Sequence, residues 1–300
     1  MENVRFRFLV RLQRHRVLAR VSKMSKTHVS SASQQRWTLD EIPWTRIEPA
    51  VVATEEELLL FVATASFVEM ATDLYVSNLL HWFSGEEDVG VWLDKHWQYE
   101  EMQHGHVLKR YMQWAWPTFD WEKVNRAFLE EFSTTCQIEA LEPTRALEMA
   151  SRCVVEMGTA SYYTALSRFS PEPVLRVLAH HIAEDEVRHY KHFYGYFCRY
   201  RDVEAPGRAQ VLLALWRRLK MIRDDDGFLA FKYVYAARHV GERVDRGVYR
   251  KVRRRCKEII GVHFPHEMSA KMLLKPLDLP LSTQRVAQTT LEALTRLLVA

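Results

Sequence analysis

Two short strings of this chain repeat one another, and each places a carboxylate and an imidazole about one helical turn apart. The strings are EEMQH over residues 100–104 and DEVRH over residues 185–189, so each is an acid followed by Glu-x-x-His. Residues three apart in a helix share one face, so the glutamate and histidine of each string can bind the same centre. The four residues concerned are Glu101 and His104, then Glu186 and His189.

A further glutamate lies about one helix length before each string, among apolar residues. Glu69, in FVEM, precedes Glu101 by 32 residues, and Glu156, in VVEM, precedes Glu186 by 30 residues. Four carboxylates and two imidazoles in two similar helix pairs are what a helical bundle needs to hold two metal ions in its core. The sequence therefore predicts a two-metal site with six ligands: Glu69, Glu101, His104, Glu156, Glu186 and His189.

The alternative is that these acids lie on helix surfaces and pair with neighbours three residues away. The apolar flanks of Glu69 and Glu156 favour the buried site. Carboxylate and imidazole ligands suit iron, and the absence of cysteine from both strings argues against zinc–thiolate or iron–sulfur chemistry.

The composition indicates an all-α protein. Its 300 residues are 48% hydrophobic, with only ten glycines and ten prolines and no alternating strand-like runs. The four cysteines are widely separated and form no CxxC motif, which predicts reduced thiols and a cytoplasmic location. The longest apolar run, residues 58–68, is about half a bilayer span, so no transmembrane segment is expected.

The chain divides into three predicted parts. Residues 1–36 contain nine Lys or Arg and one acid, Glu2, which predicts a mobile basic N-terminal arm or, as an alternative, an amphipathic targeting or membrane-surface segment. Residues 37–204 hold the predicted four-helix bundle, and residues 205–300 are expected to form a helical extension packed on it. A cationic run occupies residues 250–257 of this extension.

Residues that favour helix starts and helix ends predict the bounds of the bundle helices. A capping box at residues 54–57 is expected to open the first helix, and prolines at positions 117, 143, 171 and 173 limit the others. The predicted bundle helices span about 54–83, 86–116, 143–169 and 173–200, with a linking helix near 121–135.

The order Glu, Glu-Glu-x-x-His-Gly, Glu-x-x-Thr, Asp-Glu-x-Arg-His resembles that of the soluble acyl-carrier-protein desaturases. The resemblance covers about residues 37–200, and the six predicted ligands fall on that family's metal-ligand positions. Further matches are Trp97, Gly105, Thr159 and Asp185. The chain departs from the family at Met70, where a second glutamate is usual, at residues 71–75, and in its C-terminal third, which shows no family motif.

This resemblance implies an all-α, ferritin-like four-helix bundle with a di-metal site and additional C-terminal helices. It implies two iron ions (Fe²⁺/Fe³⁺), O₂ as co-substrate, a ferredoxin-like electron donor, and desaturation of a long acyl chain carried by acyl carrier protein or CoA. Alternative functions are another di-iron oxygenase or oxidase, of the N-oxygenase type or of the ligand-binding type with a mixed manganese–iron site. A third is a non-enzymatic ferritin-like iron-binding protein, which the length of the chain and its extra helices disfavour.

Roles follow for individual residues. Glu69 and Glu186 are expected as terminal ligands and Glu101 as a bridge, and the resemblance makes Glu156 a second bridge. Asp185 is placed to accept the second ring proton of a ligand histidine across the bundle; a surface acid is the alternative.

Three further side chains are of interest. Thr159 could offer its hydroxyl to bound oxygen, or bond back to a helix carbonyl. Trp37 resembles a tryptophan that the family places near the metals, and Trp44 competes for that position.

The charge pattern predicts the partners. The net charge is +4, and the densest cationic runs are the N-terminal arm and residues 250–257. Either surface could dock an acidic carrier or electron donor, although a solvated helix face is equally compatible with the run. No nucleic-acid motif accompanies it, so nucleic acid is not expected as a partner, and a homodimer is compatible with the sequence.

Overall fold

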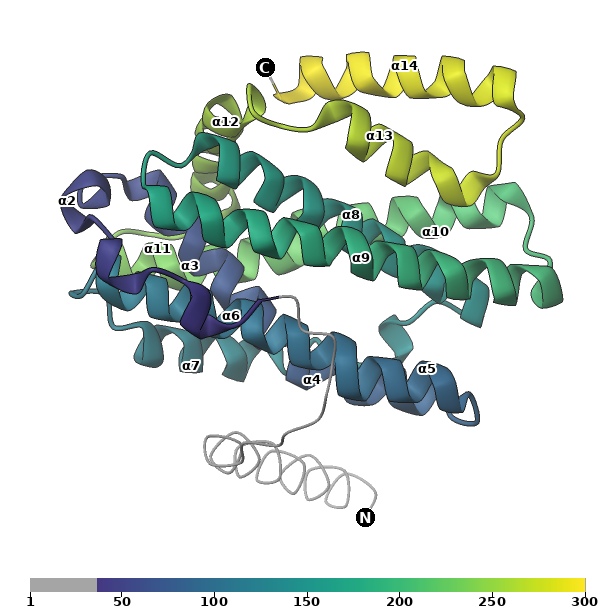
Figure 1. The fold of residues 1–300 in the computed structure, drawn as a ribbon, viewed down its shortest axis with the longest axis horizontal. Helices are drawn as coiled ribbons and strands as arrows, with labels where there is room; N and C mark the ends of the chain where they lie inside the picture. The colour runs from purple at the N-terminus through teal and green to yellow at the C-terminus, as the bar shows by residue number, and fades with distance from the viewer. Residues whose placement is uncertain (1–36, 300) are drawn as a thin grey trace. The chain divides into compact units, whose positions relative to one another are not determined.

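The computed structural model describes residues 37–299, apart from the side chains of residues 223, 224 and 297–299. The predicted basic arm, residues 1–36, lies outside the described residues. Every regular element in the described part is helical and no strand occurs there, which confirms the all-α prediction (Figure 1).

The longer helices carry the fold. They are α3 (Glu56–Met70), α4 (Thr72–Trp82), α6 (Gln98–Ala115), α7 (Trp121–Phe132), α8 (Arg145–Phe169), α9 (Pro173–Glu204), α10 (Arg208–Met221), α11 (Gly227–Arg238), α12 (Arg246–Gly261), α13 (His266–Leu274) and α14 (Leu281–Val299). The shorter ones are η1 (Leu39–Glu41), η2 (Trp44–Arg46), α2 (Pro49–Val52), α5 (Glu87–Trp92), η3 (Leu93–Trp97), η4 (Ile138–Ala140), η5 (Ile222–Asp226) and η6 (Lys275–Leu277).

Four helices form two closely packed pairs. α8 packs on α9 and α3 packs on α6, and α6 also contacts α9 (Figure 1). The α8–α9 pair is antiparallel because only residues 170–172 join it. Thr144 caps α8 by accepting a hydrogen bond from the backbone N–H of Leu147, and Glu172 caps α9 in the same way at Leu175.

The first predicted helix differs from the structure in two respects: its N-terminus has no side-chain cap, and the helix is interrupted. α3 begins at Glu56, and no side chain caps it, so the predicted capping box at residues 54–57 is wrong. The helix is also interrupted at Ala71, one residue before α4. Met70, the last residue of α3, packs directly on Gly105 of α6. A Cβ added at Gly105 would lie 2.7 Å from the Met70 side chain, which is too close for a normal contact. The glycine therefore permits the two helices to approach closely.

The second predicted helix contains a π-helical turn. The stretch predicted as 86–116 is assigned as α5, the π-turn η3 and α6 in unbroken succession. Such turns insert one extra residue per turn and are frequent near functional sites. This one ends at the buried Trp97, four residues before Glu101.

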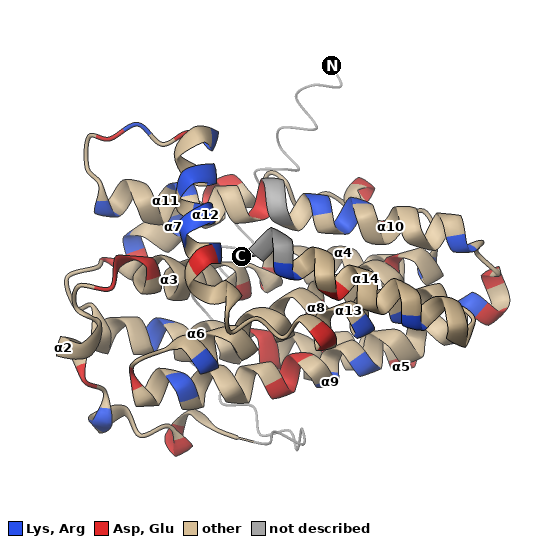
Figure 2. Ribbon diagram, turned by 90° about the horizontal axis from the view of Figure 1, so that it is seen from above, with Lys and Arg blue, Asp and Glu red and all other residues tan. Residues whose placement is uncertain are grey.

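The C-terminal helices pack on the same core. α10, α12 and α13 contact α8, and α11 contacts α3 and α7, while α14 lies against α12 and α13. The residues from Trp37 onward form one compact unit. In Figure 2 the ribbon of α12 is blue at its Lys and Arg residues.

One apolar stretch, Glu56–Trp82, is long and hydrophobic enough to cross a membrane by length and composition alone. It comprises α3 and α4, and 56% of its most apolar window is buried inside the structure. α3 packs against α6, α7 and α11, so its apolar surface serves as protein core.

Candidate metal centre

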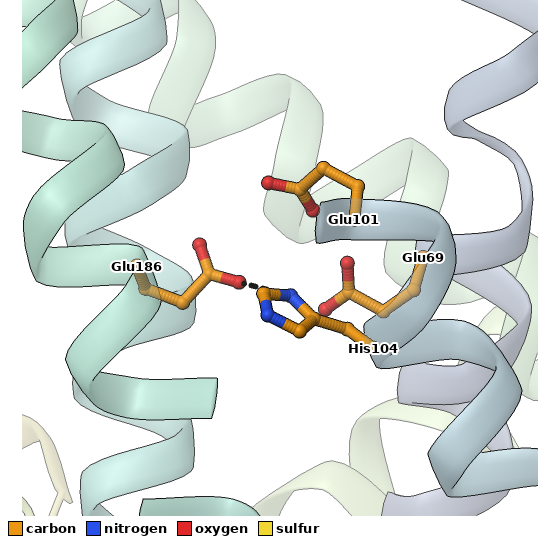
Figure 3. A group of neighbouring side chains, drawn as sticks. All are labelled: Glu69, Glu101, His104 and Glu186. Carbon is orange, nitrogen blue, oxygen red and sulfur yellow. Dashed lines mark ion pairs between the residues drawn. The ribbon is translucent and has the colours of Figure 1, made fainter. Parts of the chain in front are cut away.

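The six predicted ligands lie together in the core, each no more than 4% exposed. They come from four helices: Glu69 from α3, Glu101 and His104 from α6, Glu156 from α8, and Glu186 and His189 from α9. Their ligand atoms form two overlapping groups, each with all its atoms within 4.8 Å of one another. Figure 3 shows the first group, with Glu69, Glu101, His104 and Glu186 directed toward one point.

Two glutamates belong to both groups. Glu101 and Glu186 are shared, whereas Glu69 occurs only in the first group and Glu156 only in the second. The two residues common to both groups thus differ from the pair expected as bridges, Glu101 and Glu156, whose bridging role stays a prediction. The reason is that α6 and α9 face each other and bring their two Glu-x-x-His motifs to opposite sides of one centre.

Both histidines turn Nδ1 toward the carboxylates. His104 Nδ1 lies 3.1 Å from Glu186 Oε1, and His189 Nδ1 lies 3.0 Å from Glu101 Oε1. Yet these two nitrogens and both oxygens of Glu156 are buried without a hydrogen-bond partner of acceptable geometry. Buried polar atoms are normally satisfied. One cation in each of the two groups would satisfy these atoms, so the residues present fit a metal site.

Burial dominates the electrostatics of three of the carboxylates. Desolvation, followed by the charge of Glu101, holds the pKa of Glu69 well above its usual range. Desolvation likewise raises the pKa of Glu101, and it raises that of Glu156 to about 8. A compact set of buried carboxylates is costly without protons or cations to neutralise it.

The charges of the remaining ligands are stabilised by their neighbours. Burial alone would raise the pKa of Glu186, but the close imidazoles of His104 and His189 lower it. Burial alone would lower the pKa of each histidine, but the surrounding carboxylates raise both well above the usual value. Without metal, the cluster therefore holds protons in the places that cations would take.

Each histidine donates its other nitrogen to a carboxylate on the opposite helix. His104 Nε2 lies 3.1 Å from Asp185 Oδ2, and His189 Nε2 lies 2.7 Å from Glu100 Oε2. The first contact is the one expected for Asp185. Arg188 joins the two acids, because its guanidinium donates to Asp185 and to Glu100, each over 2.7 Å.

Glu100 and Arg188 were not identified as site residues from the sequence. The signal was present, since Glu100 precedes its Glu-x-x-His motif as Asp185 precedes the other. In a helix, the side chain of the acid one residue before a ligand is rotated by about 100° from that of the ligand. It therefore points toward the neighbouring helix and not toward the centre of the cluster.

Trp37 contacts both Asp185 and the ligand candidate His104. Its indole Nε1 donates to Asp185 Oδ2 over 2.9 Å, and its ring stacks on that of His104 with an interplanar angle of 3°. Trp44, the competing candidate, donates instead to the backbone carbonyl of Leu39. Of these two candidates, Trp37 is the one beside the cluster.

Two hydroxyl groups touch the ligands. Thr159 donates to Glu186 Oε2 over 2.7 Å and also lies 3.2 Å from the carbonyl oxygens of Val155 and Glu156. The contact with a helix carbonyl that was expected as the alternative is therefore present, and the hydroxyl also bonds a carboxylate of the cluster. Tyr163 donates to Glu69 Oε1 over 2.5 Å. It lies seven residues, or about two turns, after Glu156 and therefore on the same helix face.

Two surface cavities of the described residues lie away from the cluster. The larger, of about 910 Å³, lies between the C-terminal end of α8 and helices α12, α13 and α14, and its lining includes Arg168, Lys271 and Arg296. A second, of about 330 Å³, lies around residues 117–122. Neither is lined by any of the six cluster residues.

No model of a known protein family matches this chain, and no curated protein is significantly similar to it.

Proposed function

We propose that the protein is an oxygen-dependent oxidoreductase with two metal ions bound between α3, α6, α8 and α9. The observation that supports this most directly is the pair of overlapping ligand groups, whose buried nitrogen and oxygen atoms lack hydrogen-bond partners. Glu69, Glu101, Glu156 and Glu186 would hold these ions together with His104 and His189, and Glu101 and Glu186 belong to both groups.

Iron is the metal that this donor set favours, with a mixed manganese–iron pair as the alternative occupancy. Four carboxylates and two neutral imidazoles suit Mn²⁺ and Fe²⁺, and no cysteine is present in either group. Bound in the reduced state, two such ions supply electrons for the activation of O₂.

The surrounding residues have defined tasks in this proposal. Asp185 and Glu100 fix the histidines with Nδ1 toward the ions, and Arg188 holds the two acids in place. Such outer contacts orient ligands and raise their basicity. Thr159 restrains one oxygen of Glu186 and leaves the other free to bind, while the apolar packing around the bundle limits access of water.

For the substrate, we propose a long acyl chain that is desaturated while carried by acyl carrier protein or CoA. Support comes from the motif order shared with the soluble acyl-carrier-protein desaturases, including Gly105 and Thr159. An acidic electron donor of the ferredoxin type would complete the reaction. Another di-iron oxygenase activity would use the same metal ligands with a different substrate.

Anaerobic loading with Fe²⁺ tests the proposal. We expect two irons per chain by elemental analysis, followed by iron-dependent O₂ consumption on mixing with air. Incubation with reductant and acyl thioesters, followed by mass spectrometry, should show a product lighter by two hydrogens. Two irons per chain with O₂ uptake but only iron oxide as product would favour the iron-storage alternative. Failure to bind two metal ions would refute the proposal.

A further inference from the structure

The outer side of α10 carries three large apolar side chains in one stripe. Leu212, Leu213 and Trp216 are 56%, 51% and 57% exposed. The two leucines lie four and three residues before Trp216, so the three side chains meet on one face of the helix. Single exposed apolar residues are ordinary on protein surfaces, whereas a contiguous group marks a surface that another molecule covers.

The opposite side of α10 is already packed on the protein. Val211, Ala214 and Leu215 are buried there, and Arg218 beside them donates to Ser151 of α8 over 3.0 Å. A helix that is apolar on two sides is normally covered on both. Because the stripe is more than half exposed, the described part of the chain covers only the inner side.

The charge of α10 is of one sign. Its sequence, RAQVLLALWRRLKM, contains four basic residues and no acid. Lys220 lies one turn after Trp216 on the stripe's own face, is exposed, and has no carboxylate within ion-pair distance among the described residues. Arg208 bonds two backbone carbonyl oxygens, which leave its charge uncompensated, whereas Arg217 pairs with Glu142. Figure 2 shows α10 at one margin of the bundle, with blue positions along it.

These charges favour an anionic lipid surface as the occupant of the stripe. A two-fold contact with a second copy would place this cationic helix against an identical one. Residues 1–36 carry nine Lys or Arg and one acid, so their charge is of the same sign. Anionic headgroups complement α10. Tryptophan and leucine enter the fluid boundary between headgroups and acyl chains, which requires no matching pocket.

We propose that α10 attaches the protein to membranes that contain anionic lipids. Leu212, Leu213 and Trp216 enter the membrane interface, while Arg208 and Lys220 lie at the level of the headgroup phosphates. This role goes beyond the proposed function and uses no residue of the metal centre. The metal-free protein should therefore bind membranes as well as the metal-loaded protein does.

Co-sedimentation with lipid vesicles tests this. Full-length protein is mixed with vesicles of phosphatidylcholine, alone or with added phosphatidylglycerol. We expect binding to the mixed vesicles that weakens as salt is added, because ions screen the attraction. The triple variant with Leu212→Ser, Leu213→Ser and Trp216→Ser should bind them at least about tenfold more weakly, since its stripe no longer gains from burial. A wild type that binds neither vesicle, or a triple variant that binds like the wild type, would overturn the proposal.

A control of matched composition replaces two leucines and one tryptophan elsewhere. Leu281 and Leu294 of α14 and Trp114 of α6 are also exposed. Their triple serine variant should bind vesicles like the wild type; an equal loss in both variants would refute a specific role of α10. Circular dichroism checks the helicity of each variant. If the α10 triple variant does not fold, Trp216→Ser alone provides the test, with Trp114→Ser as its control.

Two further measurements separate insertion of the stripe from other contacts. Brominated acyl chains quench the fluorescence of a tryptophan that enters the membrane. This quenching should fall in Trp216→Phe and persist in Trp114→Phe; equal quenching in both would refute insertion of Trp216. Sedimentation velocity without lipid tests the rival occupant. A wild-type dimer that the α10 triple variant converts to a monomer would show that a second copy covers the stripe, and would overturn the lipid proposal.

Discussion

His104 Nε2 lies 3.1 Å from Asp185 Oδ2, so a ligand candidate on α6 is held by an acid on α9. The reverse relationship holds between His189 of α9 and Glu100 of α6. Each of the two helices thus provides the acid that accepts a hydrogen bond from the histidine of the other helix. Arg188 bonds both acids, so one guanidinium connects the supports of the two histidines.

Asp185→Asn should weaken metal binding without unfolding the bundle. The amide can keep the contact with the guanidinium of Arg188 but no longer provides a charged acceptor for His104 Nε2. Replacing an outer carboxylate of this kind costs roughly 10–100-fold in metal affinity. Competitive titration with a chelator measures the loss. An affinity equal to that of the wild type would show that Asp185 has no part in orienting the ligand.

His189→Ala and Glu101→Gln should each lower the bound iron and abolish O₂-dependent turnover, with helicity largely retained. Most of the stability comes from burial of the apolar helix faces, which these changes leave in place. Elemental analysis and circular dichroism provide the two readouts. His266→Ala is the control, because His266 is a histidine on α13 that lies outside the cluster and is only 9% exposed. Full turnover with stoichiometric loss of metal would contradict the proposed mechanism.

The stability of the metal-free protein should fall as the pH rises from about 4.5 to about 8. Glu156 has a usual pKa of 4.5 that burial raises to about 8, so the folded state binds the proton more tightly than the unfolded state over this range. The raised pKa values of His104 and His189 act in the same direction, since their stabilisation is lost at high pH. Thermal melts across this range, with and without metal, measure the slope.

Metal should flatten this slope, because a bound cation replaces the protons. In the metal-free form, Glu156→Gln should reduce the slope as well. A metal-free melting temperature that rises between pH 5 and pH 8 would contradict the assigned directions.

Gly105→Ala should destabilise the protein, because the new Cβ would lie 2.7 Å from Cγ and 3.1 Å from the backbone nitrogen of Met70. Overpacking of this kind costs about 1–3 kcal/mol. Gly158→Ala is the matched control on α8, where a Cβ would meet nothing within 4 Å, and it should stabilise the helix by about 0.5–1 kcal/mol. Denaturant unfolding compares the two; equal effects would show that α3 and α6 can separate freely at this point.

The cationic face of α12 should bind acidic partners. Arg250, Lys251 and Arg254 are exposed and have no carboxylate within ion-pair distance among the described residues, whereas Arg255 is tied to Glu57 at 2.5 Å. Reversal of the first three charges should raise the apparent KM for a carrier-linked substrate or an acidic electron donor. It should also flatten the salt dependence, since long-range attraction is screened by ions.

Charge reversal elsewhere provides the control for that experiment. The same change in net charge can be made on other exposed surfaces, at Lys123, Arg126 and Lys220. An equal response in both triple variants would show that net charge alone, and no docking face on α12, governs the interaction.

The sequence by itself determined the helical class and the six clustered residues. Both follow from local periodicity, since Glu-x-x-His fixes two side chains on one helix face, and apolar flanks place Glu69 and Glu156 on buried faces. Such patterns require no knowledge of how the helices are rotated against one another.

Only the tertiary structure decided which residues meet across the bundle. The sharing of Glu186 by both groups, the bond from Tyr163 to Glu69 and the link through Arg188 join residues from different helices. Their contacts depend on the rotation and spacing of packed helices, which the close approach at Gly105 helps to set. The break at Ala71 and the π-turn before Trp97 were likewise absent from the sequence reading, because tertiary packing overrides the local helical preference there.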